Sequence, residues 1–126
     1  MRSFFIVLLM IATATIAGSA VRAQSATPRL IEVTAERFEF WPPEITIDEG
    51  EAVVIHVRSE DTQHGFRLVG TGTNVTVPKR GKGVAMTTLT GLKAGRYTFE
   101  CSRMCGAGHN FMRGVLVVRA ANGRQP

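Results

Sequence analysis

The clearest strand pattern in the chain lies in the segment Ala52-Val53-Val54-Ile55-His56-Val57-Arg58. Apolar residues alternate here, so a strand would place Val53, Ile55 and Val57 on one face and His56 on the other. Alternation of this kind is typical of a strand whose one face is buried and whose other face meets solvent. The segment therefore predicts part of a sheet that packs against a second layer.

Outward from this segment, short runs rich in β-branched and aromatic residues continue on both sides, separated by glycine, proline, asparagine and aspartate. The expected strands cover residues 30–37, 45–48, 52–58, 66–69, 74–77, 84–89, 96–101 and 114–119. No helical apolar period of useful length follows the first 23 residues. Seven or eight short strands in one small chain predict an all-β fold, a β-sandwich of two sheets.

The N-terminal residues 1–23 have the composition of a secretory signal peptide. Arg2 precedes an apolar run over residues 4–17, and small residues lead to a processing site at Val21-Arg22-Ala23. We therefore expect residues 24–126 to form one domain that is exported, to the periplasm or otherwise out of the cytoplasm. The alternative is that the apolar segment is retained as a single membrane anchor.

Composition and charge exclude several classes of function. A chain of 126 residues has room for one compact domain, and its net charge is +5. The one dense basic cluster, residues 79–82, lies in a Pro/Gly turn without interleaved aromatic residues, so nucleic-acid binding is not indicated. No Ser-His-acid arrangement, paired carboxylates or phosphate loop emerges, and we expect no enzyme activity from the chain alone and a monomer.

Both cysteines lie in the segment Cys-Ser-Arg-Met-Cys-Gly-Ala-Gly-His-Asn-Phe-Met, residues 101–112. In an exported protein a nearby cysteine pair normally forms a disulfide. Here, however, His109 follows Cys105 by four residues and Met112 follows three residues later. Thiolate, imidazole and thioether are ligands that copper prefers, and the segment connects two expected strands whose ends would hold it. The sequence therefore favours a copper site over a disulfide.

A ligand from elsewhere in the chain would complete this site, and His64, in an expected turn between two strands, is the candidate. His56 lies in the middle of a strand with no soft ligand near it in sequence, so we interpret it as structural. Met86 and Met104 are interpreted as packing residues rather than ligands.

The chain resembles the cupredoxin domain that carries a CuA centre in subunit II of haem-copper oxidases and in nitrous-oxide reductase. The resemblance rests on Asp61-x-x-His64-Gly65-Phe66 and on Gly95-x-Tyr97-x-x-x-Cys101-x-x-x-Cys105-Gly106-x-x-His109-x-x-Met112. It implies a cupredoxin-like Greek-key β-sandwich that transfers single electrons to or from a redox protein, such as a cytochrome or a copper or haem-copper reductase.

The resemblance also implies the ligand roles. Cys101 and Cys105 would bridge two copper ions, and His64 and His109 would each bind one ion. Met112 would be a weak ligand to one copper, and the backbone carbonyl of Arg103 would be the corresponding weak ligand to the other.

Three departures separate the chain from the oxidase subunits. Arg103 stands where those subunits usually carry a glutamate, at most one membrane helix precedes the domain, and the aromatic cluster for electron entry is absent. The alternatives are therefore a copper chaperone or carrier of the same fold, a mononuclear copper site with one cysteine, and a Sco-like thiol-disulfide protein. The last would need alternating helices and strands, which the sequence lacks.

Overall fold

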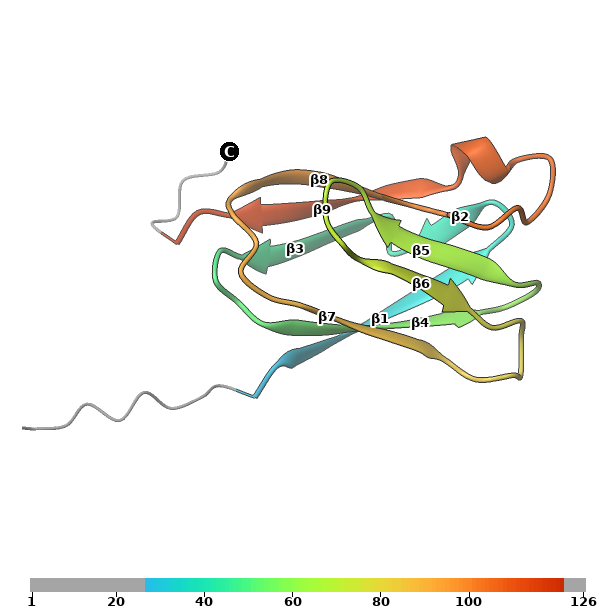
Figure 1. Cartoon of the computed structure of the whole chain (residues 1–126), viewed down its shortest axis with the longest axis horizontal. Coiled ribbons are helices and arrows are strands. Elements are labelled where there is room, and N and C mark those ends of the chain that lie inside the picture. The colour runs from blue at the N-terminus through green and yellow to red at the C-terminus, as the bar shows by residue number, and fades with distance from the viewer. Residues whose placement is uncertain (1–26, 122–126) are drawn as a thin grey trace, which may run out of the picture.

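The computed structural model describes residues 27–121, which form a β-sandwich of nine strands (Figure 1). One sheet has the order β2-β1-β4-β7, built from Glu39–Trp41, Arg29–Glu36, Val53–Ser59 and Ala85–Leu89. The other has the order β3-β9-β8-β5-β6, built from Glu44–Asp48, Arg113–Arg119, Gly95–Glu100, His64–Leu68 and Asn74–Val77. The all-β sandwich expected from the sequence is confirmed.

Over the described range the one helical element is the 3-10 turn η1, His109–Phe111, and no helix there is long and apolar enough to cross a membrane. The expected signal peptide or anchor, residues 1–23, lies outside the described residues.

Each expected strand is present, and two differences from the sequence pattern affect the site. A ninth strand, β2, pairs antiparallel with β1 through Thr34 and Trp41, and its three residues are too few to show a period. Strand β5 begins at His64 rather than at Phe66, because His64 already pairs with Val77 of β6. His64 is therefore the first residue of a strand and not a turn residue.

The core lies between the sheets and is centred on three phenylalanines from different strands. Phe40, Phe66 and Phe99 are at most 1% exposed, and their ring centroids lie 5.3 to 5.8 Å apart. Because alternate residues of a strand share a face, the side chain of His64 points inward like that of Phe66, and Cys101 follows Phe99 in the same sense. The packed aromatic rings thus fix the strand ends that carry both residues.

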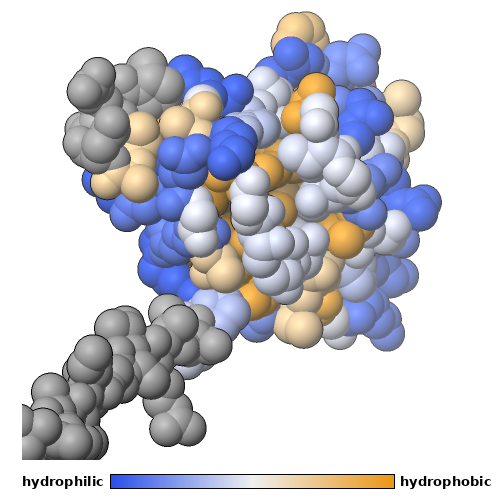
Figure 2. Space-filling view, turned by 60° about the vertical axis from the view of Figure 1, so that its left-hand side comes forward, coloured by the Kyte–Doolittle hydropathy of each residue, from blue (hydrophilic) through white to orange (hydrophobic). Residues whose placement is uncertain are grey.

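Three connections meet at one end of the sandwich. The turn between β1 and β2, the connection from β4 to β5 and the long connection from β8 to β9 all lie at the right-hand end of Figure 1. Figure 2 brings the opposite side forward, and there hydrophobic residues show as small areas among hydrophilic ones.

Candidate metal centre

The β8–β9 connection, residues 101–112, starts at the end of one strand and returns at the start of its neighbour. The amide of Cys101 donates to the carbonyl of Met112 at 3.0 Å, so the first and last donor residues of the connection are tied together. Further amide bonds run from His109 to the Gly106 carbonyl (3.1 Å) and from Met112 to the His109 carbonyl (3.2 Å). We expect the connection to keep its shape without a metal.

The two cysteines are buried and carry free thiols. Their sulfur atoms lie 3.8 Å apart, well beyond the length of a disulfide bond. Both thiols therefore face one small volume, and with His64 they form a group of three side chains whose ligand atoms lie within 4.8 Å of one another. His64 and the two cysteines could hold a metal ion together.

His64 enters this volume from β5. Its side chain is fully buried, and its Nδ1 atom lies 3.8 Å from Sγ of Cys101. The β8–β9 connection can approach this closely because residue 65 is glycine. A Cβ atom on Gly65 would lie 2.1 Å from the Ser102 hydroxyl oxygen, and the Gly65 amide instead donates to Sγ of Cys101 at 3.5 Å.

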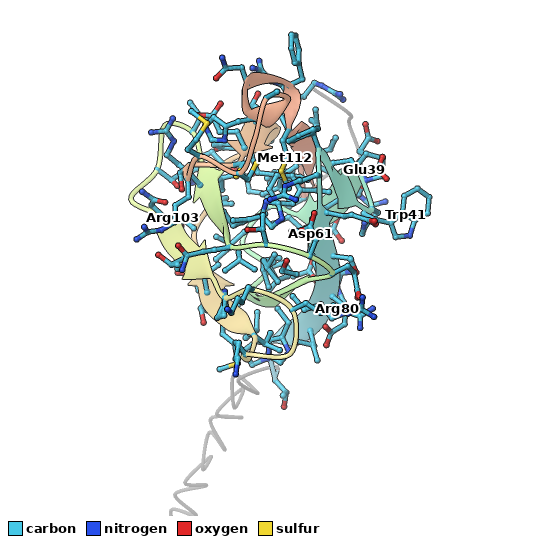
Figure 3. The ribbon with its side chains drawn as sticks, turned by 90° about the vertical axis from the view of Figure 1, so that its right-hand side faces the viewer. Glu39, Trp41, Asp61, Arg80, Arg103 and Met112 are labelled. Carbon is cyan, nitrogen blue, oxygen red and sulfur yellow. The ribbon has the colours of Figure 1, made fainter. Side chains whose placement is uncertain are left out.

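His109 and Met112 complete the soft donors on the other side of Cys105. The Nδ1 atom of His109 lies 3.7 Å from Sγ of Cys105, and the Met112 sulfur lies 3.9 Å from the same atom. Met112 is 1% exposed, whereas His109 is partly exposed. In Figure 3, which views this end of the sandwich, Met112 points toward the middle of the molecule.

Arg103 presents two different groups. Its backbone carbonyl accepts from Sγ of Cys101 at 3.0 Å, so this oxygen faces the cysteines. Its guanidinium turns away, donating from Nε to the Thr76 hydroxyl on β6 at 2.8 Å (Figure 3). The structure thus brings together all six predicted donor groups: His64, Cys101, Arg103 carbonyl, Cys105, His109 and Met112.

Asp61 contacts His64 on the side of the imidazole ring away from the cysteines. Its Oδ1 atom lies 2.6 Å from Nε2 of His64, while Nδ1 faces Cys101. A hydrogen bond on Nε2 leaves Nδ1 available as the metal ligand, as carboxylates commonly do for ligating histidines. Burial raises the pKa of Asp61, but hydrogen bonds from His64 and from the amides of Arg37 and Thr62 outweigh it and leave the pKa below its ordinary value. Asp61 stands in the sequence motif three residues before His64, which was the available signal for this role.

The Cys105 thiol resists ionisation without a metal. Burial is the largest cause, followed by the hydrogen bond to Cys101 and its charge, and together they raise the pKa of Cys105 from 9.0 to about 11. Thiolate is the form that binds metal, so a cation must supply the stabilisation that the apo-protein lacks. The site therefore favours a bound cation over a bare Cys105 thiolate.

A solvent-open pocket of about 270 Å³ reaches the donors beside β8 and β9. Its lining includes Cys101, His109 and Met112 together with the cationic Arg67 and Arg113. A metal ion or a small reductant could reach the donors by this route.

Two sequence interpretations were wrong. Met86 and Met104 do not pack in the core, since they are 61% and 78% exposed. Met86 lies on the outer face of β7 at the edge of its sheet, and Met104 lies at the surface of the β8–β9 connection. His56 has the structural role that was expected, pairing with Glu32 at 3.3 Å on the outer face of the sheet.

A sequence model described as the cupredoxin-like domain matches residues 5–118. The chain belongs to the cupredoxin-like family. Cytochrome c oxidase subunit 2 of Thermus thermophilus is 35% identical over 90 residues, which cover 71% of this chain and 64% of that protein. The same subunit from a named strain of Thermus thermophilus is also 35% identical and is covered to 52%, so the chain spans between half and two thirds of these relatives.

Solved structures with a similar fold include oxidase subunits and a blue copper protein. A haem-copper terminal oxidase dimer contains a chain that is 29% identical, with a TM-score of 0.64 over 75% of this chain and 67% of that one. The periplasmic domain of cytochrome oxidase subunit II (CoxB) of Bradyrhizobium japonicum is 18% identical, with a TM-score of 0.65, and auracyanin A of Chloroflexus aurantiacus is 19% identical, with a TM-score of 0.58. These matches cover 75% and 73% of this chain, and 86% and 99% of the respective solved chains, and they show a shared fold.

Copper is the metal that this cupredoxin-like family and this donor set imply. The fit rests on the chemistry of the described side chains, because buried thiols with imidazole and thioether groups suit copper better than a hard cation such as magnesium or calcium.

Proposed function

We propose that this protein is an exported electron carrier whose dinuclear, CuA-like copper centre is held by His64, Cys101, Cys105, His109, Met112 and the backbone carbonyl of Arg103. The observation that carries the proposal is the placement of both thiols 3.8 Å apart, with one imidazole beside each sulfur. A symmetric set of this kind offers two ions a histidine each and two shared sulfurs.

When loaded with copper, the centre would store and release one electron. The chain's own contribution is to hold the donors in one geometry, so that little has to move when the charge changes. Strand ends anchor His64 and Cys101, the hydrogen bond from Cys101 to Met112 closes the connection, and Asp61 orients His64.

The partner would be a redox protein such as a cytochrome or a copper or haem-copper reductase, outside the cytoplasm. Similarity to subunit 2 of Thermus cytochrome c oxidase supports a partner of this class. The guanidinium of Arg103 gives this end of the molecule a cation, which should favour the reduced form of the centre through simple electrostatics.

Reversible electron exchange tests the proposal. Copper-loaded protein should pass through many cycles with a small reductant and a small oxidant without losing metal, because rigid donors suit both oxidation states. Loss of copper during the first reduction would contradict an electron-carrier role. The Met86→Leu variant, changed at a methionine that is 61% exposed on β7 of the other sheet, is the matched control.

Copper delivery is the second candidate function, and the solvent-open pocket beside Cys101, His109 and Met112 favours it. An electron carrier should release copper slowly to a competing chelator and should gain thermal stability on loading, since His64 and residues 101–112 are tied together by the metal. Complete transfer of copper within seconds to an apo-oxidase domain, with sluggish electron exchange, would favour delivery instead.

A further inference from the structure

Arg37, in the turn between β1 and β2, lies outside both ligand motifs yet contacts both ligand-bearing segments. Its amide donates to Oδ2 of Asp61 at 3.0 Å, and Asp61 in turn holds His64. Its side-chain Nε donates to the carbonyl of Cys105 at 2.7 Å. One residue therefore connects the support of His64 to the backbone of Cys105.

Phe38, in the same β1–β2 turn, packs against the β8–β9 connection. A Cβ atom built on Gly108 would lie 2.3 Å from its ring, and one built on Gly106 would lie 2.9 Å from it. Gly108 has a φ of −90°, which any residue adopts, so its backbone does not require glycine. What requires glycine at position 108 is the Phe38 ring.

We propose that Arg37 and Phe38 are positioning residues of the copper centre, which fix residues 105–112 against the segment that carries His64. This rests on the proposed copper site and adds a third segment to it. Neither side chain is a ligand; each acts on the connection, Arg37 through a hydrogen bond to the Cys105 carbonyl and Phe38 through ring contacts with the two glycines. The β1–β2 turn thereby defines the distance between the donors before any metal arrives.

The apo-protein allows a test that does not depend on copper. Hydrogen exchange at the amides of His109, Phe111 and Met112, which are bonded within the connection, reports its order, and the amide of Glu49, bonded to Arg119, is an internal reference at the opposite end. Gly108→Ala should speed exchange at the three amides about tenfold, the cost of one typical hydrogen bond, and leave Glu49 unchanged. Gly72→Ala is the matched control, because a Cβ atom there meets open space.

The decisive comparison repeats the Gly108→Ala change in a Phe38→Ala background. If the ring imposes the constraint, the added methyl group should change exchange less than about twofold there, because the coupling between the two positions has gone. An equal effect of Gly108→Ala in both backgrounds would overturn the role of Phe38. This holds even if Phe38→Ala alone loosens the connection.

Arg37 needs a pair of variants that separates geometry from charge. Arg37→Gln and Arg37→Lys should both speed exchange at the same amides, whereas Arg96→Gln, at an arginine paired with Glu44 elsewhere on the sheets, should not. After copper loading, Arg37→Lys should also alter the hyperfine splitting of the copper spectrum at unchanged copper content. Unchanged exchange in both Arg37 variants would overturn the role of Arg37.

Failure of this inference and failure of the proposed function give different results. A wild-type protein that binds no copper but shows the Gly108 and Phe38 coupling would refute the copper proposal and retain the fixed connection. A protein that binds copper normally without any coupling would retain the function and refute the positioning role.

Discussion

The protein carries a histidine, a methionine and a carboxylate close together in two regions, and the regions differ in burial. At the copper end, His64 and Met112 are at most 1% exposed and Asp61 is hydrogen-bonded to His64. On the outer face of the four-stranded sheet, His56 pairs in register with Met86 on one side and Glu32 on the other. Met86 there is 61% exposed, and His56 bonds Glu32 rather than facing a thiol.

Residue types alone therefore do not make the site. The outer row, which consists of Glu32, His56 and Met86, has the imidazole and thioether of a copper site. Solvent competes for each of these groups, however, and neither cysteine lies there. At the copper end the core phenylalanines place the donors, and burial makes a bare Cys105 thiolate unfavourable until a cation arrives.

The largest effect is expected from the cysteines. Cys101→Ser and Cys105→Ser should each abolish the spectrum of the proposed dinuclear centre, because each thiolate would bridge both ions. Optical and electron paramagnetic resonance spectra after anaerobic copper loading measure this, with Met86→Ser as the control in the outer row. A variant that kept the dinuclear spectrum would show that its cysteine is not a bridging ligand.

Substitution of His64 and of His56 should have very different effects on copper affinity. His64→Ala should weaken copper binding by more than about a hundredfold. Loss of a residue that only supports a ligand costs at most about a hundredfold in metal affinity, and loss of the ligand itself should cost more. Asp61→Asn, which alters that support, should cost about ten- to a hundredfold. His56→Ala should leave affinity unchanged in a competitive chelator titration. Equal affinities for the His64 and His56 variants would remove His64 from the ligand set.

Most of the fold follows from the sequence for a local reason. Strands such as β4 have enough residues to show alternation, and the observed burial of Val53, Ile55 and Val57 follows it. Strand β2 has only three residues, too few to show alternation. The sequence therefore did not indicate that the turn before it, which bears Arg37 and Phe38, contacts the site.

That these six groups lie close together was also predictable, because five of them stand in two short motifs with soft ligand types. What the sequence could not give is the contact of a distant turn with those motifs. Arg37 and Cys105 are 68 residues apart, and no local pattern marks the hydrogen bond between them.

A smaller effect is expected from the methionines. Met112→Leu should keep copper bound and shift its reduction potential, since a thioether is a weak ligand and the leucine side chain has a similar volume. Met86→Leu should change neither property. Spectroelectrochemical titration measures the potential, and loss of copper from Met112→Leu as complete as that from the cysteine variants would reverse our ranking of strong and weak ligands.

The smallest effect concerns the pH dependence of apo-protein stability. The pKa of Cys105 is higher in the folded chain than its ordinary value, so between pH 9 and about 11 the unfolded chain has released this proton while the folded chain retains it. Stability of the apo-protein should therefore fall across this interval. For Asp61, whose pKa is lowered by folding, stability should fall at the acid end, as the pH drops below the ordinary carboxyl value through the folded one.

Denaturant titrations of the reduced apo-protein at several pH values measure both slopes. Cys105→Ser should remove the alkaline slope, and Asp61→Asn should reduce the acid one, to which Glu51 also contributes because its hydrogen bond to Arg29 lowers its pKa. His56→Ala, in the outer row, should alter neither. An alkaline slope that persists in Cys105→Ser would assign that titration to a different group.

We propose that the two thiols, 3.8 Å apart, hold two copper ions that share one unpaired electron. Copper analysis and electron paramagnetic resonance on the same anaerobically loaded, reduced-thiol sample test it most directly. We predict about two copper ions per chain and a hyperfine pattern in which the electron couples equally to two nuclei. One copper per chain at full loading, with the simple four-line pattern of a single nucleus, would contradict the account and assign the chain a mononuclear cupredoxin site.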